Sequence, residues 1–453
     1  MGRLFGTDGV RGVANEFLTC EMAMRIGRAT ASVIVGRRRR RGVFALGWDP
    51  RTSSEMLAAS VTAGLCSAGA DVIMLGVIPT PGVAYLIQKY KCDGGIMISA
   101  SHNGPEFNGI KVFGGEGYKV PDELEERIES LALSGDIPLS SPHDIGRVER
   151  AENAVHDYIE YLKSTVLHSL DGMKILLDCS NGATSTVAEK LFSEMGAEVT
   201  VISADPTGDN INLGCGSTSI ENISSAVKGR GYDGGAAFDG DGDRCIAVDG
   251  EGRVLDGDDI MAVCALDMKR RGKLKKNTVV GTVMTNFGFG RYCRDNGIDL
   301  ITTKVGDRYV LEEMLLGGFS LGGEQSGHII FRDHSTTGDG LLTALQLFSL
   351  SARLGEGLTS LSGQVEKYPQ SSALVSTDSS GKLLFYTDHR IRDAVDRAEA
   401  ELGDRGRVVV RPSGTEPLIR IMAEGEDEDT IKRITEELRE TVSAVLGGEE
   451  ECE

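Results

Sequence analysis

One phrase recurs three times in this chain, and it limits the possible folds more than any other feature. In each copy an apolar run ends in a polar loop, a helical stretch follows, and a glycine precedes a second apolar run. These paired runs span residues 43–46 and 72–75, 175–177 and 199–202, and 279–283 and 300–302. The repetition predicts three similar α/β domains with mixed, largely parallel sheets covered by helices.

The glycines of the repeat predict how its helices end. Gly69, Gly196 and Gly297 each stand between the helical stretch and the second apolar run. A glycine just past a helix usually adopts a positive φ, which other residues avoid. We therefore expect a left-handed backbone at all three positions.

A further strand closes each copy, preceded by two glycines at 94–95, 234–235 and 317–318. The loops that follow are Ser99-Ala100-Ser101-His102-Asn103, Asp239-Gly240-Asp241-Gly242-Asp243-Arg244 and Gly323-Glu324-Gln325-Ser326-Gly327-His328. Open α/β sheets bind ligands at the carboxyl ends of their strands. The repeat therefore predicts three polar loops at equivalent strand ends.

The C-terminal part follows another pattern. Strand-like runs at 373–376 and 408–411 are accompanied by helical stretches at 387–400 and 428–445, which predicts a smaller α+β unit. We place the domains at residues 1–149, 150–253, 254–366 and 367–453. The first three contain, in order, the serine loop (99–103), the aspartate loop (239–244) and the glutamate loop (323–328).

The aspartate loop indicates a metal site. Asp239, Asp241 and Asp243 alternate with glycines, and carboxylates this close repel each other unless a cation lies among them. A calcium-binding EF-hand is excluded, because Arg244 and Gly250 stand where glycine and glutamate are required. Three oxygen ligands leave room for a phosphate oxygen on Mg²⁺.

Two other loops allow more than one interpretation. Ser101 follows the buried run 96–98, where an ordinary Ser/Asn turn is also typical. Lys111 lies ten residues on, and it can act as a base only if it faces Ser101. The loop at 323–328 suits sugar hydroxyls, although a glycine-flanked turn with a satisfied histidine is common.

A candidate phosphate site follows a strand of the C-terminal unit. It combines an arginine fork, two hydroxyls and a glycine backbone, and a second arginine comes shortly after them. The residues are Arg411, Ser413, Gly414, Thr415 and Arg420.

Composition excludes several classes of protein. The net charge of −20 disfavours nucleic-acid binding, and no apolar run is long enough for a membrane span. Nine cysteines without a CxxC pair, and the lack of a signal-peptide core at the start, favour a cytoplasmic location with reduced thiols. No nucleotide-binding fingerprint is present. A small anionic partner is still compatible with this charge, because local basic loops can override the overall field, and the oligomeric state stays open between monomer and homodimer.

Taken together, these loops and the opening Phe5-Gly6-Thr7-Asp8-Gly9-Val10-Arg11-Gly12 resemble the α-D-phosphohexomutase superfamily over essentially the whole chain. The resemblance implies four domains around a central cleft. It is strongest to enzymes that interconvert glucosamine 6-phosphate and glucosamine 1-phosphate through a phosphoserine enzyme and a 1,6-bisphosphate. Glucose or mannose phosphates handled by the same mechanism are the alternative, and a noncatalytic sugar-phosphate sensor is the remaining one.

The resemblance also implies roles for single residues. Ser101 would carry the phosphate, and Asp239, Asp241 and Asp243 would hold Mg²⁺ against it. Arg11, Lys111 and Arg244 would surround the transfer centre, with Lys111 and His328 as candidates for proton transfer. Glu324 and Ser326 would hold sugar hydroxyls. The phosphate that does not react would bind Arg411, Ser413, Gly414 and Thr415, with Arg420 nearby. Glucosamine 1,6-bisphosphate or a related sugar bisphosphate would act as activator.

Two residues depart from the superfamily pattern. Gly104 follows Asn103 where a proline is usual, and Trp48 stands where an arginine is frequent. Neither change removes a reacting group, so they bear on loop geometry and specificity.

A Mg²⁺ phosphatase with an aspartate nucleophile is a further alternative. It would also use an aspartate-rich loop, but it would not need the serine loop.

Overall fold

The structure, a computed structural model, describes residues 4–6, 8–36, 41–413 and 417–446. Residue contacts divide the chain into two compact units, Met1–Thr282 with Ile298–Gln364 and Val283–Gly297 with Val365–Glu453. The segment 283–297, which we expected within the third domain, thus groups with the C-terminal residues.

The first sheet of the larger unit has seven strands. In spatial order they are β1 (Phe5–Gly6), β2 (Gly9–Val13), β6 (Phe107–Gly114), β5 (Gly94–Ile98), β3 (Val43–Trp48), β4 (Asp71–Val77) and β7 (Val148–Arg150). Its helices are α1 (Cys20–Val35), α2 (Ser54–Ser67), α3 (Thr80–Lys89) and α4 (Asp122–Ser134).

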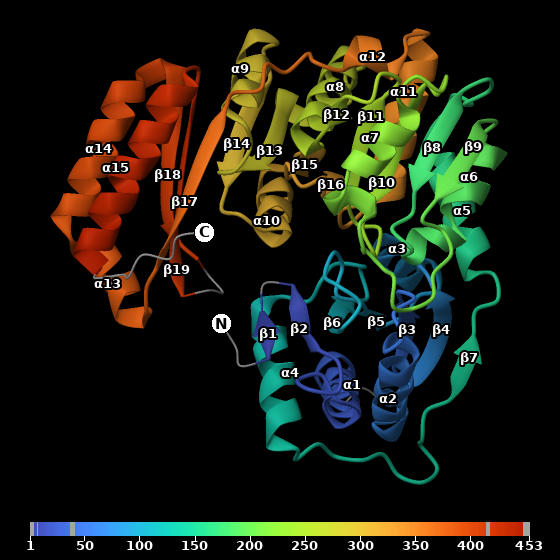
Figure 1. Ribbon diagram of the computed structural model, residues 1–453. Coiled ribbons are helices and arrows are strands. Elements are labelled where there is room, and N and C mark those ends of the chain that lie inside the picture. The colour runs from blue at the N-terminus through green and yellow to red at the C-terminus, as the bar shows by residue number, and fades with distance from the viewer. Residues whose placement is uncertain (1–3, 7, 37–40, 414–416, 447–453) are drawn as a thin grey trace. The chain divides into compact units, whose positions relative to one another are not determined.

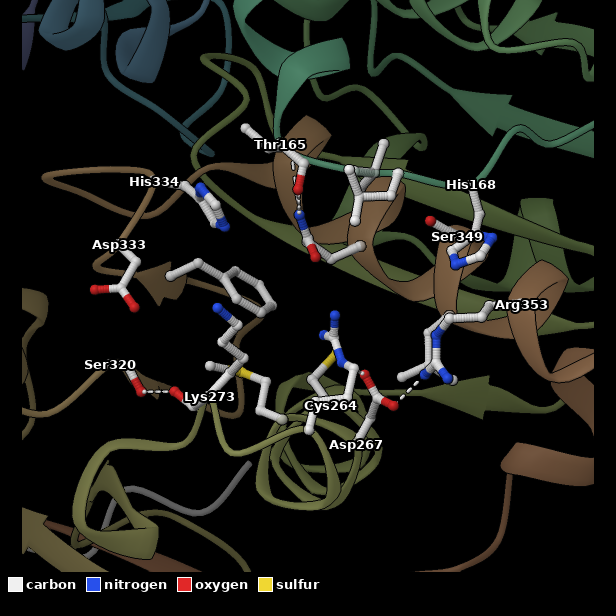
Figure 2. Close-up of a pocket in the computed structure, with 17 residues that line it drawn as sticks. Thr165, His168, Cys264, Asp267, Lys273, Ser320, Asp333, His334, Ser349 and Arg353 are labelled. Carbon is white, nitrogen blue, oxygen red and sulfur yellow. Dashed lines mark hydrogen bonds and ion pairs between the residues drawn. The ribbon is translucent and has the colours of Figure 1, made fainter.

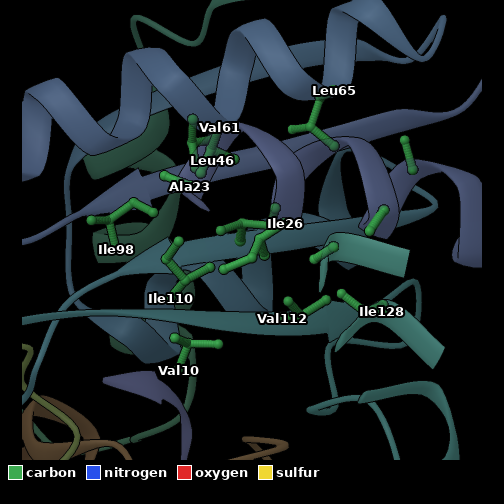
Figure 3. Close-up of a cluster of buried hydrophobic side chains, with 14 of the residues drawn as sticks. Val10, Ala23, Ile26, Leu46, Val61, Leu65, Ile98, Ile110, Val112 and Ile128 are labelled. Atoms are coloured by element: carbon green, nitrogen blue, oxygen red, sulfur yellow. The ribbon is translucent and has the colours of Figure 1, made fainter. Parts of the chain in front are cut away.

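The main core of this sheet lies between its strands and the helices α1, α2 and α4 (Figure 3). Ile110 and Val112 on β6 point into this core. Because successive side chains of a strand point to opposite faces, Lys111 between them points to the other face. Helix α3 packs on that face, where a Cβ on Gly95 would lie only 2.4 Å from Cδ1 of Ile87.

Two further sheets complete the larger unit. The second contains, in order, β12 (Val254–Leu255), β11 (Cys245–Asp249), β10 (Gly234–Phe238), β8 (Lys174–Asp178) and β9 (Glu198–Ile202). The third contains β14 (Asp299–Thr303), β13 (Thr278–Thr282), β15 (Leu321–Gly323) and β16 (Ile329–Phe331). The accompanying helices are α5 (Ala154–Ser164), α6 (Ala188–Glu194), α7 (Glu221–Val227), α8 (Gly257–Arg270), α10 (Asp307–Gly317), α11 (Gly340–Leu354) and α12 (Leu358–Leu361).

The three sheets share one four-stranded core order, which is β4-β3-β5-β6 in the first, β9-β8-β10-β11 in the second and β14-β13-β15-β16 in the third (Figure 1). In each core the first two pairings are parallel and the last is antiparallel. The expected threefold α/β repeat with mixed sheets is confirmed, and the three polar loops follow the equivalent strands β5, β10 and β15.

The glycines bear out only part of the expected pattern. Gly69, Gly196 and Gly297 have φ values of +86°, +97° and +61°, so the helix-end prediction is confirmed. The glycine pairs at 94–95 and 234–235 lie inside strands β5 and β10 rather than before them. The third pair ends helix α10 instead, with a left-handed Gly318, so it is not equivalent to the other two.

The smaller unit is α+β, as expected. Its antiparallel sheet has the order β17 (Gln370–Ser376), β19 (Leu418–Gly425) and β18 (Gly406–Pro412), and its helices are α9 (Phe287–Asp295), α13 (Ser379–Thr387), α14 (His389–Leu402) and α15 (Glu428–Leu446). Helix α14 starts later than expected because the Asp388 side chain caps it by accepting from the Arg390 amide. Within the described ranges, no helix combines the length and hydropathy needed to cross a bilayer.

Candidate active site

Ser101 lies in the loop after β5. Its side chain is buried, and its hydroxyl donates a 2.7 Å hydrogen bond to Oδ2 of Asp239. Nδ1 of His102 lies 3.3 Å from the same hydroxyl. The backbone at Ser101 has a φ of +52°, a left-handed conformation that residues with a Cβ adopt where their surroundings hold them. The serine is therefore fixed against the aspartate loop of the second sheet.

The three aspartates after β10 form one buried cluster. One carboxylate oxygen from each of Asp239, Asp241 and Asp243 lies within 4.8 Å of the others. Burial, reinforced by the charges of Asp243 and Asp241, raises the pKa of Asp239 well above its usual range. One oxygen of Asp241 and one of Asp243 are buried without a hydrogen-bond partner among the described residues. A hard cation satisfies such oxygens, so this cluster can bind a divalent metal ion.

A glycine allows the serine and aspartate loops to approach each other. A Cβ on Gly240 would lie 2.6 Å from the carbonyl oxygen of Ser101. Any larger residue at this position would push the two loops apart. Gly240 thus allows the close backbone contact, and Gly242, with a φ of +70°, allows the turn.

Lys111 reaches the aspartate cluster from β6. Its Nζ lies 2.9 Å from Oδ2 of Asp241, 3.0 Å from Oδ2 of Asp8 and 3.5 Å from Oδ2 of Asp243. Burial lowers the pKa of Lys111, but these three carboxylates outweigh it and hold the pKa well above its usual range. Lys111 is therefore an ammonium ion that neutralises the cluster in this state, rather than a free base.

Two arginines add positive charge around Ser101. Arg11 pairs with Asp8 at 2.9 Å and donates to Oδ1 of Asn103 at 2.9 Å. Nε of Arg244 lies 3.9 Å from Oδ1 of Asp243. Burial, together with the charges of Arg244 and Arg11, lowers the pKa of His102 to about 4. Arg11 and Arg244 can therefore supply positive charge to a phosphate carried on Ser101.

His328 faces the same cluster from the third sheet. Its Nδ1 lies 3.7 Å from Oδ2 of Asp243. The amide of Gly338 donates to Nε2 at 3.0 Å, so Nε2 carries no proton in this arrangement. Nδ1 therefore carries a proton directed towards Asp243, and although burial lowers the pKa of His328, Asp243 and Asp307 outweigh it and raise that pKa above its usual value.

The other residues of the glutamate loop have different surroundings. Oε1 of Glu324 accepts a 3.1 Å hydrogen bond from the amide of Gly306, and Ser326 is exposed. The side chain of Gln325 donates to Oδ2 of Asp256 at 3.2 Å. Asp256 also caps helix α8, so Gln325 positions this loop on the helix.

The sequence analysis missed a chain of charges that links the first and third sheets. Lys119 pairs with Asp8 and also lies 2.6 Å from Oδ2 of Asp307. Asp8 in turn contacts Lys111, and Asp307 lies 3.7 Å from Nε2 of His328. Asp8 belongs to the opening motif at residues 5–12, but nothing in the sequence relates Lys119 to Asp307, which is 188 residues away.

Two buried residues of the first repeat were also missed. Thr80, at the start of α3, donates from its hydroxyl to Oδ2 of Asp241 at 2.5 Å. Arg51 forms a buried ion pair with Asp49 at 2.8 Å and binds the serine loop. Arg51 follows the first strand of the first repeat, at a strand end, which is the one signal that pointed to it.

The expected phosphate loop lies in the smaller unit. Arg411 on β18 stands directly opposite Arg420 on β19, and burial together with Arg420 lowers the pKa of Arg411. The carbonyl of Ser413 accepts a 2.6 Å hydrogen bond from Nζ of Lys382. Like charges placed opposite each other in a sheet are unfavourable, and an anion between them would relieve the repulsion. Gly414 and Thr415 lie outside the described residues.

A cavity of about 390 Å³ lies elsewhere in the larger unit, beside helices α8 and α11 (Figure 2). Its lining includes Arg271 and Arg353, and both are paired with Asp267. Arg353 also lies in the last turn of α11, where the helix end carries partial negative charge. The two arginines of this cavity therefore share one carboxylate of the protein.

Comparison with protein families gives four consecutive matches along the chain. They are described as phosphoglucomutase/phosphomannomutase alpha/beta/alpha domain I at residues 2–137, domain II at 156–252, domain III at 256–368 and the C-terminal domain at 381–441.

Several curated proteins are similar over their full length. The chain is 52% identical to the phosphoglucosamine mutase of Thermoanaerobacter sp. (strain X514), across 98% of this chain and 100% of that protein. It is 48% identical to the phosphoglucosamine mutase of Clostridium acetobutylicum, across 98% and 99% of the two chains.

Solved structures share the fold at lower identity. A phosphoglucomutase/phosphomannomutase family protein from Burkholderia thailandensis superimposes with a TM-score of 0.84 at 23% identity, covering 98% of this chain and 97% of that one. The Aspergillus fumigatus N-acetylphosphoglucosamine mutase in complex with GlcNAc-6P and magnesium has a TM-score of 0.67 at 15% identity, covering 98% and 96%.

Proposed function

Because the chain belongs to the phosphoglucomutase/phosphomannomutase family, we propose that it is an isomerase that interconverts glucosamine 6-phosphate and glucosamine 1-phosphate. The choice of the amino sugar rests on the phosphoglucosamine mutases that are about half identical over their full length. The single observation that carries the mechanism is the buried Ser101 hydroxyl, 2.7 Å from Asp239 in a cluster of three carboxylates.

In the proposed reaction Ser101 carries a phosphoryl group and transfers it to a sugar monophosphate. The Oγ–P bond of phosphoserine breaks as a bond forms to the free hydroxyl of the sugar, which gives a 1,6-bisphosphate. The bisphosphate then turns over in the site and returns its other phosphate to Ser101. Glucosamine 1,6-bisphosphate, or a related sugar bisphosphate, also restores phosphoserine when it is lost.

The residues around Ser101 supply charge and position for this transfer. Arg11 and Arg244 hold the phosphoryl oxygens by charge, which is the main form of catalysis open to a phosphoryl transfer. Asp239, Asp241 and Asp243 would hold Mg²⁺, which would supply a counter-charge for the phosphoryl group and relieve the repulsion among the carboxylates.

The proton of the attacking hydroxyl needs an acceptor, and two side chains are candidates. Lys111 accepts it only after the carboxylates around it are neutralised, because they hold it as an ammonium ion. His328 accepts the proton on Nε2 only if the amide of Gly338 no longer donates a hydrogen bond to that atom. Proton transfer thus depends on a change at the site when substrate and metal are bound.

The remaining residues select the sugar phosphate. Glu324 and Ser326 bind hydroxyls of the sugar. The phosphate that does not react binds the C-terminal loop, whose residues are Arg411, Ser413, Gly414, Thr415 and Arg420. The domain boundaries at 149/150, 253/254 and 366/367 are part of this proposal, and each domain supplies one loop.

We propose a cytoplasmic location for the enzyme, because nine scattered cysteines without a CxxC pair favour a reducing compartment.

A coupled assay that compares the 1-phosphates and 6-phosphates of glucosamine, glucose and mannose tests the function. We expect the highest kcat/KM with glucosamine phosphates and activity that disappears on chelation of Mg²⁺. A higher kcat/KM with glucose or mannose phosphates would mean that one of these sugars, and not glucosamine, is the substrate. The proposed phosphoserine mechanism would be unaffected by that result. No turnover of any of them would contradict the proposed function.

A further inference from the structure

The buried guanidinium of Arg51 is fully engaged with the serine loop. Its Nε donates to Oδ2 of Asp49 at 2.8 Å. One terminal nitrogen donates to the carbonyls of Ser101 and Asn103, both at 2.9 Å. The other donates to the carbonyl of Phe107 at 3.0 Å and to that of Gly104. All five N–H groups of the arginine therefore have acceptors, and four of these are backbone oxygens of one loop.

A second connection joins the same ion pair to Ser101. The hydroxyl of Ser99 donates to Oδ2 of Asp49 at 2.6 Å and accepts from the amide of Ser101 at 2.9 Å. The amide and the carbonyl of Ser101 are thus both tied to the Asp49–Arg51 pair. These bonds hold the residue in its left-handed conformation.

The repeats show that the arginine is special to the serine loop. Near the end of the first strand of each repeat, a side-chain oxygen accepts from the amide two residues later. The pairs are Asp49 with Arg51 at 3.2 Å, Asp178 with Ser180 at 2.9 Å and Asn286 with Gly288 at 3.0 Å. This turn is common to all three repeats. Only in the first repeat does the residue whose amide donates, Arg51, have a long cationic side chain.

We propose that Arg51 is a positioning residue for the phosphoryl transfer, which acts by fixing the backbone of the loop that carries Ser101. This inference rests on the proposed role of Ser101 as phosphate carrier. Arg51 is buried behind the loop, and its donors are used up by Asp49 and the loop carbonyls, so it acts on the reaction only through the loop. A lysine has a single nitrogen at this position and cannot span four carbonyls.

The first test is Arg51→Lys. A displacement of the reacting group by about 1 Å can cost roughly 100-fold in rate, so we expect kcat to fall by roughly 10- to 100-fold. KM for the sugar phosphate should change little, because Arg51 does not contact the substrate. Arg353→Lys is the control, since Arg353 also pairs with an aspartate but lies beside the separate cavity of Figure 2.

The second test is a matched pair of hydroxyl deletions on one carboxylate. Ser99 and Ser54 both donate to Asp49, at 2.6 Å and 2.8 Å, but only Ser99 also binds Ser101. Ser99→Ala and Ser54→Ala keep the ion pair, so both are expected to fold. We expect Ser99→Ala to lower kcat roughly tenfold, the worth of one charge-assisted hydrogen bond, and Ser54→Ala to lower only the melting temperature.

Mass spectrometry of Ser101 and the melting temperature accompany the kinetics. Lower melting temperatures with unchanged kcat in Arg51→Lys and Ser99→Ala would overturn the inference, because the pair would then only stabilise the fold. Equal losses of kcat in Ser99→Ala and Ser54→Ala would do so too. An active wild-type enzyme whose Ser101 is never phosphorylated would instead contradict the proposed function.

Discussion

At the scale of single residues, the site is defined by charges that balance each other within one buried cluster. Three carboxylates lie around Lys111, and Arg11 and Arg244 pair with Asp8 and Asp243 of the same cluster. An ion of charge +2 fits beside Lys111 because Asp241 and Asp243 each keep one oxygen without a hydrogen-bond partner among the described residues.

The first prediction concerns the metal ligands. Asp241→Asn keeps the side-chain size but removes one negative charge from the cluster. We expect Mg²⁺ affinity, measured by calorimetry, to fall by at least roughly tenfold, and kcat to fall with it. Asp267→Asn is the control, because Asp267 pairs with Arg271 and Arg353 at the separate cavity. Unchanged Mg²⁺ affinity in Asp241→Asn would remove this aspartate from the ligand set.

The second prediction concerns Lys111 as a counter-ion. Lys111→Met leaves the buried carboxylates uncompensated, which costs about 3–5 kcal/mol of stability in comparable cases. We expect a large drop in melting temperature without Mg²⁺ and a greater rise on adding Mg²⁺ than in the wild type. The half-buried Lys163, which pairs with Glu160 and Glu194 at the surface, provides the control variant Lys163→Met. Equal Mg²⁺ shifts in Lys111→Met and wild type would mean that Lys111 does not share the cluster's charge.

At the scale of elements, three equivalent strand ends explain why distant loops meet. Strands β5, β10 and β15 occupy the same place in their sheets, so each presents its loop at a corresponding edge. The close contact of the first two loops depends on Gly240, where a Cβ would lie 2.6 Å from the Ser101 carbonyl.

The third prediction follows from this contact. Gly240→Ala should separate the serine and aspartate loops, so kcat should fall while the fold persists. Gly357→Ala is the matched control, since a Cβ on Gly357 meets nothing within 4 Å. Steady-state kinetics and melting curves of both variants check this, and full activity of Gly240→Ala would show that the close approach is not needed.

Much of this arrangement was predictable, because local sequence patterns indicate where strands and helices end. The repeat, the helix-ending glycines and the aspartate cluster follow from spacing alone. The ion pair of Lys119 with Asp307 and the five hydrogen bonds of Arg51 do not follow from spacing. They depend on which atoms of distant segments come within reach in the folded chain. The third glycine pair was misplaced because a helix end and a close-packed strand both favour glycine.

At the scale of the whole molecule, the proposed reaction uses both compact units, although the net charge of the chain is −20. A chain this acidic repels anions in general, so local clusters of arginine must attract the sugar phosphate. Arg411 and Arg420 form such a pair in the smaller unit.

The fourth prediction tests this second anion site. Arg411→Lys keeps the charge but loses the planar fork, so KM for glucosamine 6-phosphate should rise with a smaller change in kcat. The loss in kcat/KM should be roughly ten- to hundredfold, and phosphorus NMR should detect more free 1,6-bisphosphate. Arg407→Lys on the same strand is the control, because Arg407 pairs with the buried Glu424. An unchanged KM in Arg411→Lys would place the phosphate elsewhere.

The most direct measurement follows the phosphoryl group itself. The enzyme is incubated with a sugar 1,6-bisphosphate labelled at phosphorus, and the label on each peptide is located by mass spectrometry. The account predicts label on Ser101, its transfer to glucosamine 6-phosphate on addition of that substrate, and neither label nor turnover in Ser101→Ala. Full turnover by Ser101→Ala, or label on another residue with Ser101 bare in an active enzyme, would contradict it.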